Sequence, residues 1–175
     1  MIPRPGFVIL SGCSGGGKST LLAALAETGL SVVPEPGRRI IEAGGPDPAR
    51  DPMGFARMAL ELSLSDYAEA FALPAPVIFD RGLVDAAVNL AHQEGRALDT
   101  SLLAAHPFAQ TMFMAQPWPE IYVTDAARRH SLSEGIAEYG RLCAAYSALG
   151  YKFTFLPKTD ITARVAYLRH HLSPV

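Results

Sequence analysis

The feature that most constrains this chain is a glycine-rich segment near its start, Gly12-Cys13-Ser14-Gly15-Gly16-Gly17-Lys18-Ser19. It fits the pattern Gly-x-x-x-x-Gly-Lys-Ser/Thr, in which the glycines let backbone N–H groups turn inward around a phosphate. The apolar residues 7–10 before it predict a buried strand, and residues 20–27 after it predict a helix. Because the pattern has mechanical meaning only between a strand and a helix, this context predicts a working phosphate-binding loop.

The residues of this loop have separate expected roles. Lys18 is expected to reach the β- and γ-phosphate oxygens and to act in catalysis, and the Ser19 hydroxyl is expected to ligate Mg²⁺. The positive N-terminal end of the following helix adds to the attraction for phosphate. ATP and Mg²⁺ are therefore the expected cofactors. The residues expected to bind the nucleotide are Gly12, Ser14, Gly15, Gly16, Gly17, Lys18, Ser19 and Thr20.

Strand-like and helix-like segments alternate along the rest of the chain. The periodicity predicts further strands over residues 30–33, 77–80, 111–114 and 151–156. It predicts helices over residues 38–43, 51–71, 83–93, 131–150 and 160–172, with a short one beginning near Asp99. This alternation indicates an α/β protein with a three-layer P-loop NTPase fold, in which helices cover both faces of a central, mostly parallel five-stranded sheet.

Two of these helices carry a clear apolar stripe. In the helix that starts at a Ser131–Glu134 capping box, Ile136, Tyr139, Cys143 and Tyr146 are predicted to be buried. In the long helix after Asp51 the predicted buried residues are Met53, Ala56, Leu60, Leu64, Tyr67 and Phe71.

Composition limits the size and setting of the protein. With 175 residues, 49% of them hydrophobic, the chain can bury one sizeable core, so we predict a single domain over residues 1–175. The net charge of −2, without a block of like charges, argues against nucleic-acid and membrane partners. No apolar run reaches the ~18 residues of a membrane helix, and a cytoplasmic protein with free Cys13 and Cys143 thiols is expected.

Two charged pairs follow predicted strands. Asp80 closes the apolar strand 77–80, where an acid is suited to act in catalysis by holding Mg²⁺, although it also suits a helix cap. Arg81 next to it is a candidate for contact with a phosphate or a second substrate. Glu35, after the strand 30–33, is placed to accept a proton from an acceptor hydroxyl, although a solvated turn is the alternative.

Further arginines lie near these pairs. Arg38 and Arg39 are one helical turn beyond Glu35, so they are candidates to bind an anionic substrate or Glu35 itself. Arg128 and Arg129 precede the capping box, where they are candidates to fold over the triphosphate and neutralise its charge during transfer. A solvated helix end is the other interpretation of this pair.

With these residues in view, the chain resembles a family of small AAA-type ATPases whose members look like P-loop nucleoside and nucleotide kinases. The segments that carry the resemblance are Ser11 to Thr20, Val33 to Arg39, Phe79 to Gly82, Pro117 to Tyr122, and Arg128-Arg129 before a helix containing Tyr139. The resemblance implies a phosphate-loop strand next to the Asp80 strand, a helical lid around Arg128 and Arg129, and a general base at Glu35, which precedes Pro36 as in deoxynucleoside kinases. Gly82 departs from the Ser or Tyr that often follows the acid-Arg pair in those enzymes.

Two functions fit this set of residues. The first is transfer of the γ-phosphoryl group of ATP to a small-molecule acceptor, as in a nucleoside or nucleotide kinase. The second is an ATP- or GTP-dependent regulatory NTPase without such an acceptor. A guanine-specific switch usually carries Asn-Lys-x-Asp after a late strand, and this chain has Pro157-Lys158-Thr159-Asp160 there, which disfavours GTP. The identity of the acceptor stays open.

Overall fold

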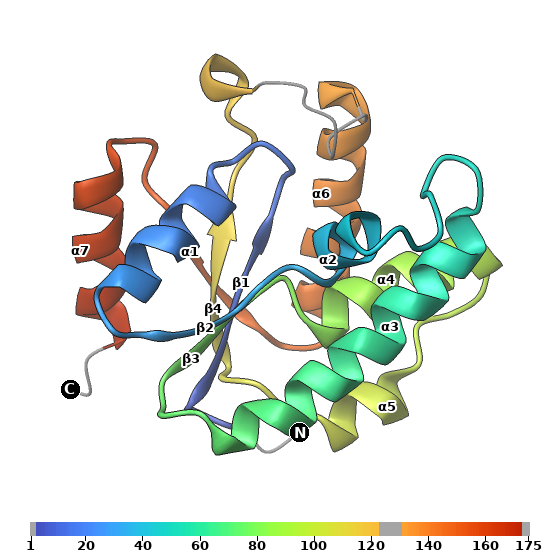
Figure 1. The fold of residues 1–175 in the computed structure, drawn as a ribbon, viewed down its shortest axis with the longest axis horizontal. Helices are drawn as coiled ribbons and strands as arrows, with labels where there is room; N and C mark the ends of the chain where they lie inside the picture. The colour runs from blue at the N-terminus through green and yellow to red at the C-terminus, as the bar shows by residue number, and fades with distance from the viewer. Residues whose placement is uncertain (1–2, 123–130, 173–175) are drawn as a thin grey trace.

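A single parallel sheet organises the computed structural model, which describes residues 3–122 and 131–172. Its strand order is β2-β3-β1-β4-β5, and all four neighbouring pairs are parallel (Figure 1). The strands are β1 (Phe7–Gly12), β2 (Ser31–Val33), β3 (Val77–Asp80), β4 (Thr111–Ala115) and β5 (Lys152–Phe155). The predicted α/β fold with a five-stranded parallel sheet is therefore confirmed. Because β1 pairs with both β3 and β4, it is the central strand, and its carboxyl end lies in the middle of the carboxyl edge of the sheet.

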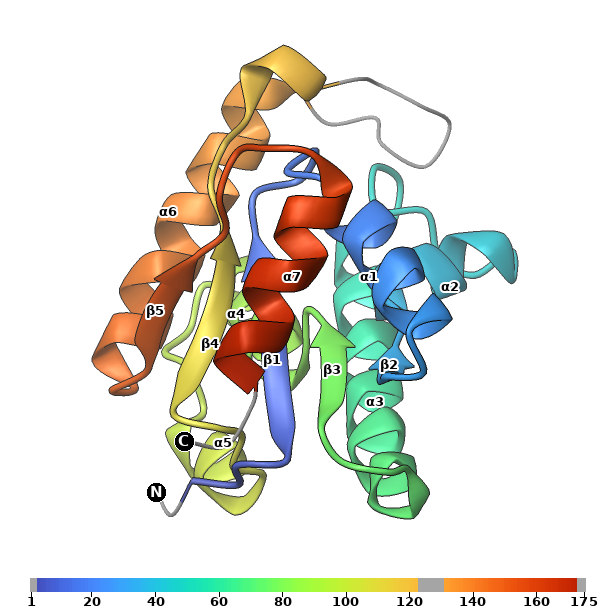
Figure 2. The same ribbon diagram turned by 90° about the vertical axis from the view of Figure 1, so that its left-hand side faces the viewer.

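Helices cover both faces of this sheet (Figures 1 and 2). One face packs against α1 and α7, and the other packs against α3, α4, α5 and α6. The helices are α1 (Lys18–Glu27), α2 (Pro36–Glu42), α3 (Pro52–Glu69), α4 (Leu83–Glu94), α5 (Thr100–Ala105), α6 (Leu132–Ala148) and α7 (Ile161–Leu172). Two short 3₁₀ helices, η1 (Ala70–Ala72) and η2 (Pro119–Ile121), complete the described elements.

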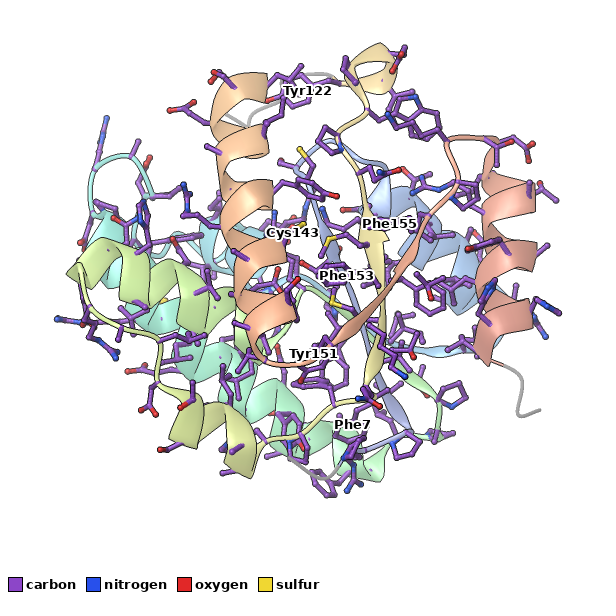
Figure 3. All side chains as sticks on the ribbon, turned by 180° about the vertical axis from the view of Figure 1, so that it is seen from behind. Phe7, Tyr122, Cys143, Tyr151, Phe153 and Phe155 are labelled. Carbon is purple, nitrogen blue, oxygen red and sulfur yellow. The ribbon has the colours of Figure 1, made fainter. Side chains whose placement is uncertain are left out.

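The core has two parts, one on each face of the sheet, because successive side chains of β1 point to opposite faces. Phe7 and Ile9 point to the face of α3 to α6, while Val8 and Leu10 point to α1 and α7. On the first face the Phe7 ring meets Tyr67 edge to face, with centroids 5.2 Å apart. Figure 3 shows the edge strand β5 with Tyr151, Phe153 and Phe155 along it, and Phe155 remains 45% exposed. The interior is therefore built around the central strand that leads into the phosphate-binding loop.

Two predicted core residues prove to be exposed. Ile136 is 45% exposed, because α6 turns Gly135, Leu142 and Tyr146 towards the sheet instead. Phe71 is 56% exposed, because α3 ends at Glu69 and Phe71 belongs to the 3₁₀ turn that follows. These two assignments were wrong, since a stripe at helical spacing does not show where a helix ends or which flank of it meets the sheet.

The capping box of α6 is present as predicted, with the Ser131 hydroxyl accepting from the Glu134 backbone and the Glu134 carboxylate accepting from Ser131 N–H. The segment with Arg128 and Arg129, on which the lid prediction rests, lies outside the described residues. Within the described ranges, every helix is too short or too polar to cross a bilayer.

Candidate functional site

The phosphate-binding loop begins where β1 meets the end of β4. The backbone N–H of Cys13 donates to the Ala115 carbonyl at 2.9 Å, which ties the loop to the neighbouring strand. Gly12 has φ +124°, and a Cβ there would lie 2.2 Å from the Ala115 carbonyl oxygen. Because only glycine tolerates both the dihedral angle and the close approach, the first glycine of the motif is required by the fold itself.

Lys18 is buried at the first position of α1. Its Nζ donates to the carbonyl oxygens of Gly12 at 3.2 Å and Cys13 at 2.8 Å, so the side chain curls back over its own loop. Burial lowers the pKa of Lys18, and the nearby Arg81 guanidinium acts in the same direction. Ser19 and Thr20 follow it with exposed side chains on the first turn of the helix.

Asp80 ends β3 beside Leu10 of β1 and is only 4% exposed. Its Oδ1 is buried without a hydrogen-bond partner, and burial raises the pKa of Asp80 to about 6, with the Glu35 carboxylate adding to the shift. A buried carboxylate oxygen without a partner, near Lys18, has the chemistry of a ligand for a hard divalent cation. Asp80, and the Ser19 hydroxyl on the first turn of α1, are therefore compatible with a Mg²⁺ ion, and their role as its ligands stays a prediction.

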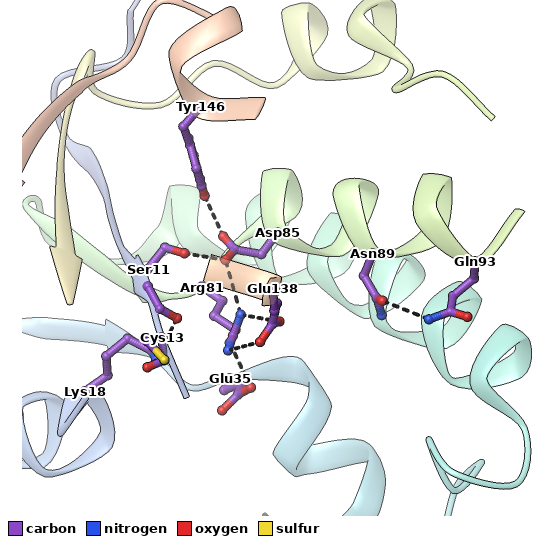
Figure 4. A network of polar contacts seen from close by, with 11 residues as sticks. Ser11, Cys13, Lys18, Glu35, Arg81, Asp85, Asn89, Gln93, Glu138 and Tyr146 are labelled. Atoms are coloured by element: carbon purple, nitrogen blue, oxygen red, sulfur yellow. Dashed lines mark hydrogen bonds and ion pairs between the residues drawn. The ribbon is translucent and has the colours of Figure 1, made fainter. Parts of the chain in front are cut away.

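Arg81 stands at the centre of a carboxylate cluster (Figure 4). Its Nε lies 3.1 Å from Glu35 Oε1, and its Nη1 lies 2.9 Å from Glu138 Oε1 and 3.5 Å from Asp85 Oδ1. Burial opposes the charge, but Glu138, Glu35 and Asp85 together hold the pKa of Arg81 well above its ordinary value. Its φ of +60° is strained for a residue with a side chain, and its N–H donates to the Leu10 carbonyl. Arg81 thus joins α2, α4 and α6 rather than offering a free charge.

A buried hydrogen-bond network supports this cluster from behind (Figure 4). The hydroxyls of Ser11, on β1, and Tyr146, on α6, both donate to the carboxylate of Asp85 on α4. Burial raises the pKa of Asp85, although Arg81 acts in the opposite direction. The network connects the strand that carries the phosphate-binding loop to the two helices that hold Arg81.

One cavity of about 490 Å³ opens between the phosphate-binding loop and the carboxylate cluster. Its lining comes from five regions that are distant in sequence. They include Lys18 and Ser19 of α1, Glu35, Gly37 and Arg38 at α2, Phe55 and Ala59 of α3, Asp85, Asn89, His92 and Gln93 of α4, and Glu134, Glu138 and Arg141 of α6. The cavity therefore places a carboxylate-rich pocket beside the predicted phosphate site.

The predicted substrate residues do not all line the cavity. Glu35, Arg38 and Arg81 line the cavity. Arg39 instead forms a two-oxygen ion pair with Asp66 of α3, at 2.7 and 2.8 Å, and does not line it. Arg39 therefore links α2 and α3, and its role as a substrate contact stays a prediction. The other predicted catalytic pair, Arg128 and Arg129, lies outside the described residues.

Sequence reasoning missed Arg164 of α7, which reaches the loop from the opposite side. Its Nη2 donates to the Gly16 carbonyl at 3.0 Å and its Nη1 to the Gly17 carbonyl at 3.3 Å. The guanidinium also lies 5.5 Å from the centre of the Trp118 ring. Asp85, Glu138 and Arg141 were missed as well. No local pattern marks Asp85 out from an ordinary position on an amphipathic helix. Glu138 and Arg141 repeat the Glu-x-Gly-Arg pattern of Glu35 to Arg38, and this signal could have found them.

Comparisons with known proteins agree with this geometry. The sequence profile of the AAA domain family matches residues 7–164, and a search of curated protein sequences finds no match. Among solved structures, deoxyadenosine kinase from M. mycoides with bound dATP is similar at 16% identity, TM-score 0.58, over 95% of this chain and 98% of that one. Shikimate kinase from Aquifex aeolicus is similar at 14% identity and TM-score 0.58, over 95% of each chain.

A second shikimate kinase, from Acinetobacter baumannii in complex with shikimate, is similar at 13% identity and TM-score 0.56, over 95% of this chain and 93% of that one. At such identities the likeness shows the fold alone. The fold shared with these structures is that of P-loop small-molecule kinases, as the sequence had indicated.

Proposed function

The chain belongs to the AAA domain family, and from that premise we propose that it is an enzyme that transfers the γ-phosphoryl group of ATP to a small-molecule acceptor. The cytoplasm is the setting we propose for it. The observation that carries the proposal is the continuous cavity between the phosphate-binding loop and Glu35. A regulatory NTPase needs only the end of this cavity at the phosphate-binding loop, whereas the cavity continues to a carboxylate-lined end at Glu35, Asp85 and Glu138.

The proposed roles follow from where the side chains lie. Lys18 would leave its loop carbonyls for the β- and γ-phosphate oxygens, which make a stronger, charge-assisted partner. Ser19 and Asp80 would hold Mg²⁺. That ion, when bound, neutralises charge on the phosphate oxygens. Within the acceptor compartment, Glu35 would accept the proton of the acceptor hydroxyl as it attacks.

Arg81 is proposed as a positioning residue. Its contact with Glu35 fixes the direction of that carboxylate, and its contact with Glu138 fixes Arg81 in turn. Because phosphoryl transfer relies on positioning and charge stabilisation, a rigidly held base is worth more than a mobile one. Arg128 and Arg129, which lie outside the described residues, would add positive charge around the transferred group, and Arg38 would contact the acceptor.

The test is phosphoryl transfer from ATP to a panel of nucleosides, nucleotides and hydroxy acids, with release of inorganic phosphate followed in parallel. Product that depends on acceptor, and that falls about 100-fold or more in Glu35→Gln, supports the proposal. Binding of ATP to Glu35→Gln, measured by calorimetry, should match that of the unchanged protein.

The contrary result is slow hydrolysis that no acceptor accelerates and that Glu35→Gln leaves unchanged. In that case the regulatory NTPase is favoured, and the compartment beside the loop has another use. Lys18→Ala cannot separate the two functions, since both need the bound triphosphate.

A further inference from the structure

Two segments with the same pattern, Glu-x-Gly-Arg, contribute residues to the lining of the cavity. Glu35-Pro36-Gly37-Arg38 begins α2, and Glu138-Tyr139-Gly140-Arg141 lies in the middle of α6. Both helices reach Arg81, α2 through Glu35 and α6 through Glu138 (Figure 4). In each segment the glutamate contacts Arg81 and the arginine, three residues later, lines the cavity. Sequence spacing and structure thus place one arginine on each wall, one turn beyond the glutamate held by Arg81.

These two arginines differ from the others near the site. Arg39 is paired with Asp66, Arg81 is surrounded by three carboxylates, and Arg164 donates to loop carbonyls. By contrast, neither Arg38 nor Arg141 has a hydrogen-bond or ion-pair partner among residues 3–122 and 131–172. The Nε of Arg38 is moreover buried without a hydrogen-bond partner, a destabilising arrangement that it shares with the Nε of Arg164.

Two regions of the cavity differ in charge. The end near Arg81 carries the carboxylates of Glu35, Asp85 and Glu138 against a single guanidinium. An anionic group would be repelled there, whereas a hydroxyl would be accepted by Glu35. Within the described part of the lining, the arginines without a partner are Arg38 and Arg141. Each lies one helical turn after the glutamate that contacts Arg81.

We infer that the acceptor carries an anionic group, a carboxylate or a phosphate, which Arg38 and Arg141 bind while its hydroxyl lies at Glu35. This inference rests on the proposed function and narrows it to anionic acceptors, so that neutral nucleosides and sugars are excluded. Planar guanidinium groups suit either anion, because each can donate two parallel N–H bonds to a pair of oxygens.

The first test measures anion binding without catalysis. The full chain is saturated with Mg²⁺ and a non-hydrolysable ATP analogue, which fills the γ-phosphate position, and is then titrated with inorganic phosphate in a calorimeter. One further binding site is expected. Arg38→Gln and Arg141→Gln should each weaken it about tenfold, and the double variant should abolish it.

Arg57→Gln is the matched control, because Arg57 is an exposed arginine of α3 outside the cavity lining. It should bind phosphate like the unchanged protein. The affinity for the ATP analogue should be the same in all four variants, and near-identical melting temperatures show that they fold. Absence of a phosphate site, or its persistence in the double variant, overturns the inference. So does a loss of analogue affinity, since the arginines would then serve the nucleotide.

The second test separates the two kinds of anion by transfer from ATP. The acceptor panel is arranged in pairs that differ only in charge, namely nucleosides against nucleoside monophosphates and hydroxy acids against their methyl esters. Product is expected from the charged member of a pair alone, and the pair that responds identifies phosphate or carboxylate. Transfer to neutral members overturns the inference and leaves the proposed function intact. If phosphate binds through both arginines but no acceptor is phosphorylated, the anion-binding site stands and the proposed phosphoryl transfer is contradicted.

Discussion

The two halves of the site are built in different ways. The proposed nucleotide half consists of one contiguous loop, with its backbone groups and the Lys18 side chain, supported by the ends of β1 and β4 and by Arg164. The proposed acceptor half consists of side chains from α2, α3, α4 and α6 near Arg81. The shape of the nucleotide half depends on main-chain conformation, whereas the shape of the acceptor half depends on ion pairs between different helices. Substitutions should therefore affect the two halves through different measurable quantities.

The largest effect is expected from Lys18→Ala in the nucleotide half. Phosphoryl transfer should fall by about 1,000-fold or more, which corresponds to roughly 4 kcal/mol, because the β- and γ-phosphates lose their charged partner. Steady-state rates with saturating acceptor measure this loss. The free energy of unfolding should not fall by a comparable amount, because Lys18 is buried and its pKa is lowered, so its charge is costly to the folded protein. A rate within tenfold of the unchanged protein would contradict the role of Lys18.

Gly12→Ala should damage the same half through the backbone. Its Cβ would meet the Ala115 carbonyl oxygen at 2.2 Å and force an unfavourable φ, so a loss of about 3 kcal/mol in unfolding free energy is expected from urea denaturation. Gly140→Ala is the matched control, because a Cβ there meets nothing within 4 Å in a helix interior. That control should be neutral or about 0.5–1 kcal/mol more stable. Equal stability of the two variants would show that the loop does not depend on β4.

Asp85→Asn should affect the acceptor half instead. It removes a charge next to Arg81 while keeping a similar shape, and a stability loss of about 2 kcal/mol is expected because Ser11 and Tyr146 lose a charged acceptor. The kcat/KM for the acceptor should fall about tenfold, with ATP affinity unchanged in calorimetry. Tyr146→Phe, which removes one donor, should cost about 1 kcal/mol. If the affinity for ATP falls as much as the kcat/KM for the acceptor, Asp85 supports both halves, and the contrast between them is wrong.

The smallest effect is expected from Arg164→Ala. Its two hydrogen bonds go to loop carbonyls rather than to substrate, so ATP affinity should weaken about fivefold, equivalent to roughly 1 kcal/mol, while the acceptor KM stays the same. Arg169→Ala serves as a control on the same helix, because Arg169 is exposed in the last turn of α7. A larger effect on the acceptor than on ATP would mean that α7 acts on the other half.

The same contrast explains what the sequence revealed. The loop at Gly12 to Ser19 was identified because its pattern is local, and Asp80 was found because an acid that ends a buried strand is unusual. Glu35 was predicted from its place after β2. Asp85, Glu138 and Arg141 escaped notice, because helices that meet only after folding bring them to the cavity. The contact of Arg39 with Asp66 was missed for the same reason, since Asp66 lies 27 residues away in sequence.

Arg81 is shared by Glu35 of one wall and Glu138 of the other, and this sharing constrains how the protein can change over generations. A substitution at either glutamate alone leaves Arg81 without one of its partners, so most single steps towards a new acceptor should lower fitness. Selection experiments that randomise Glu35, Arg81 and Glu138 together should recover folded variants that one-site libraries miss. Changes at this part of the cavity should then be tolerated mainly as paired replacements on α2 and α6.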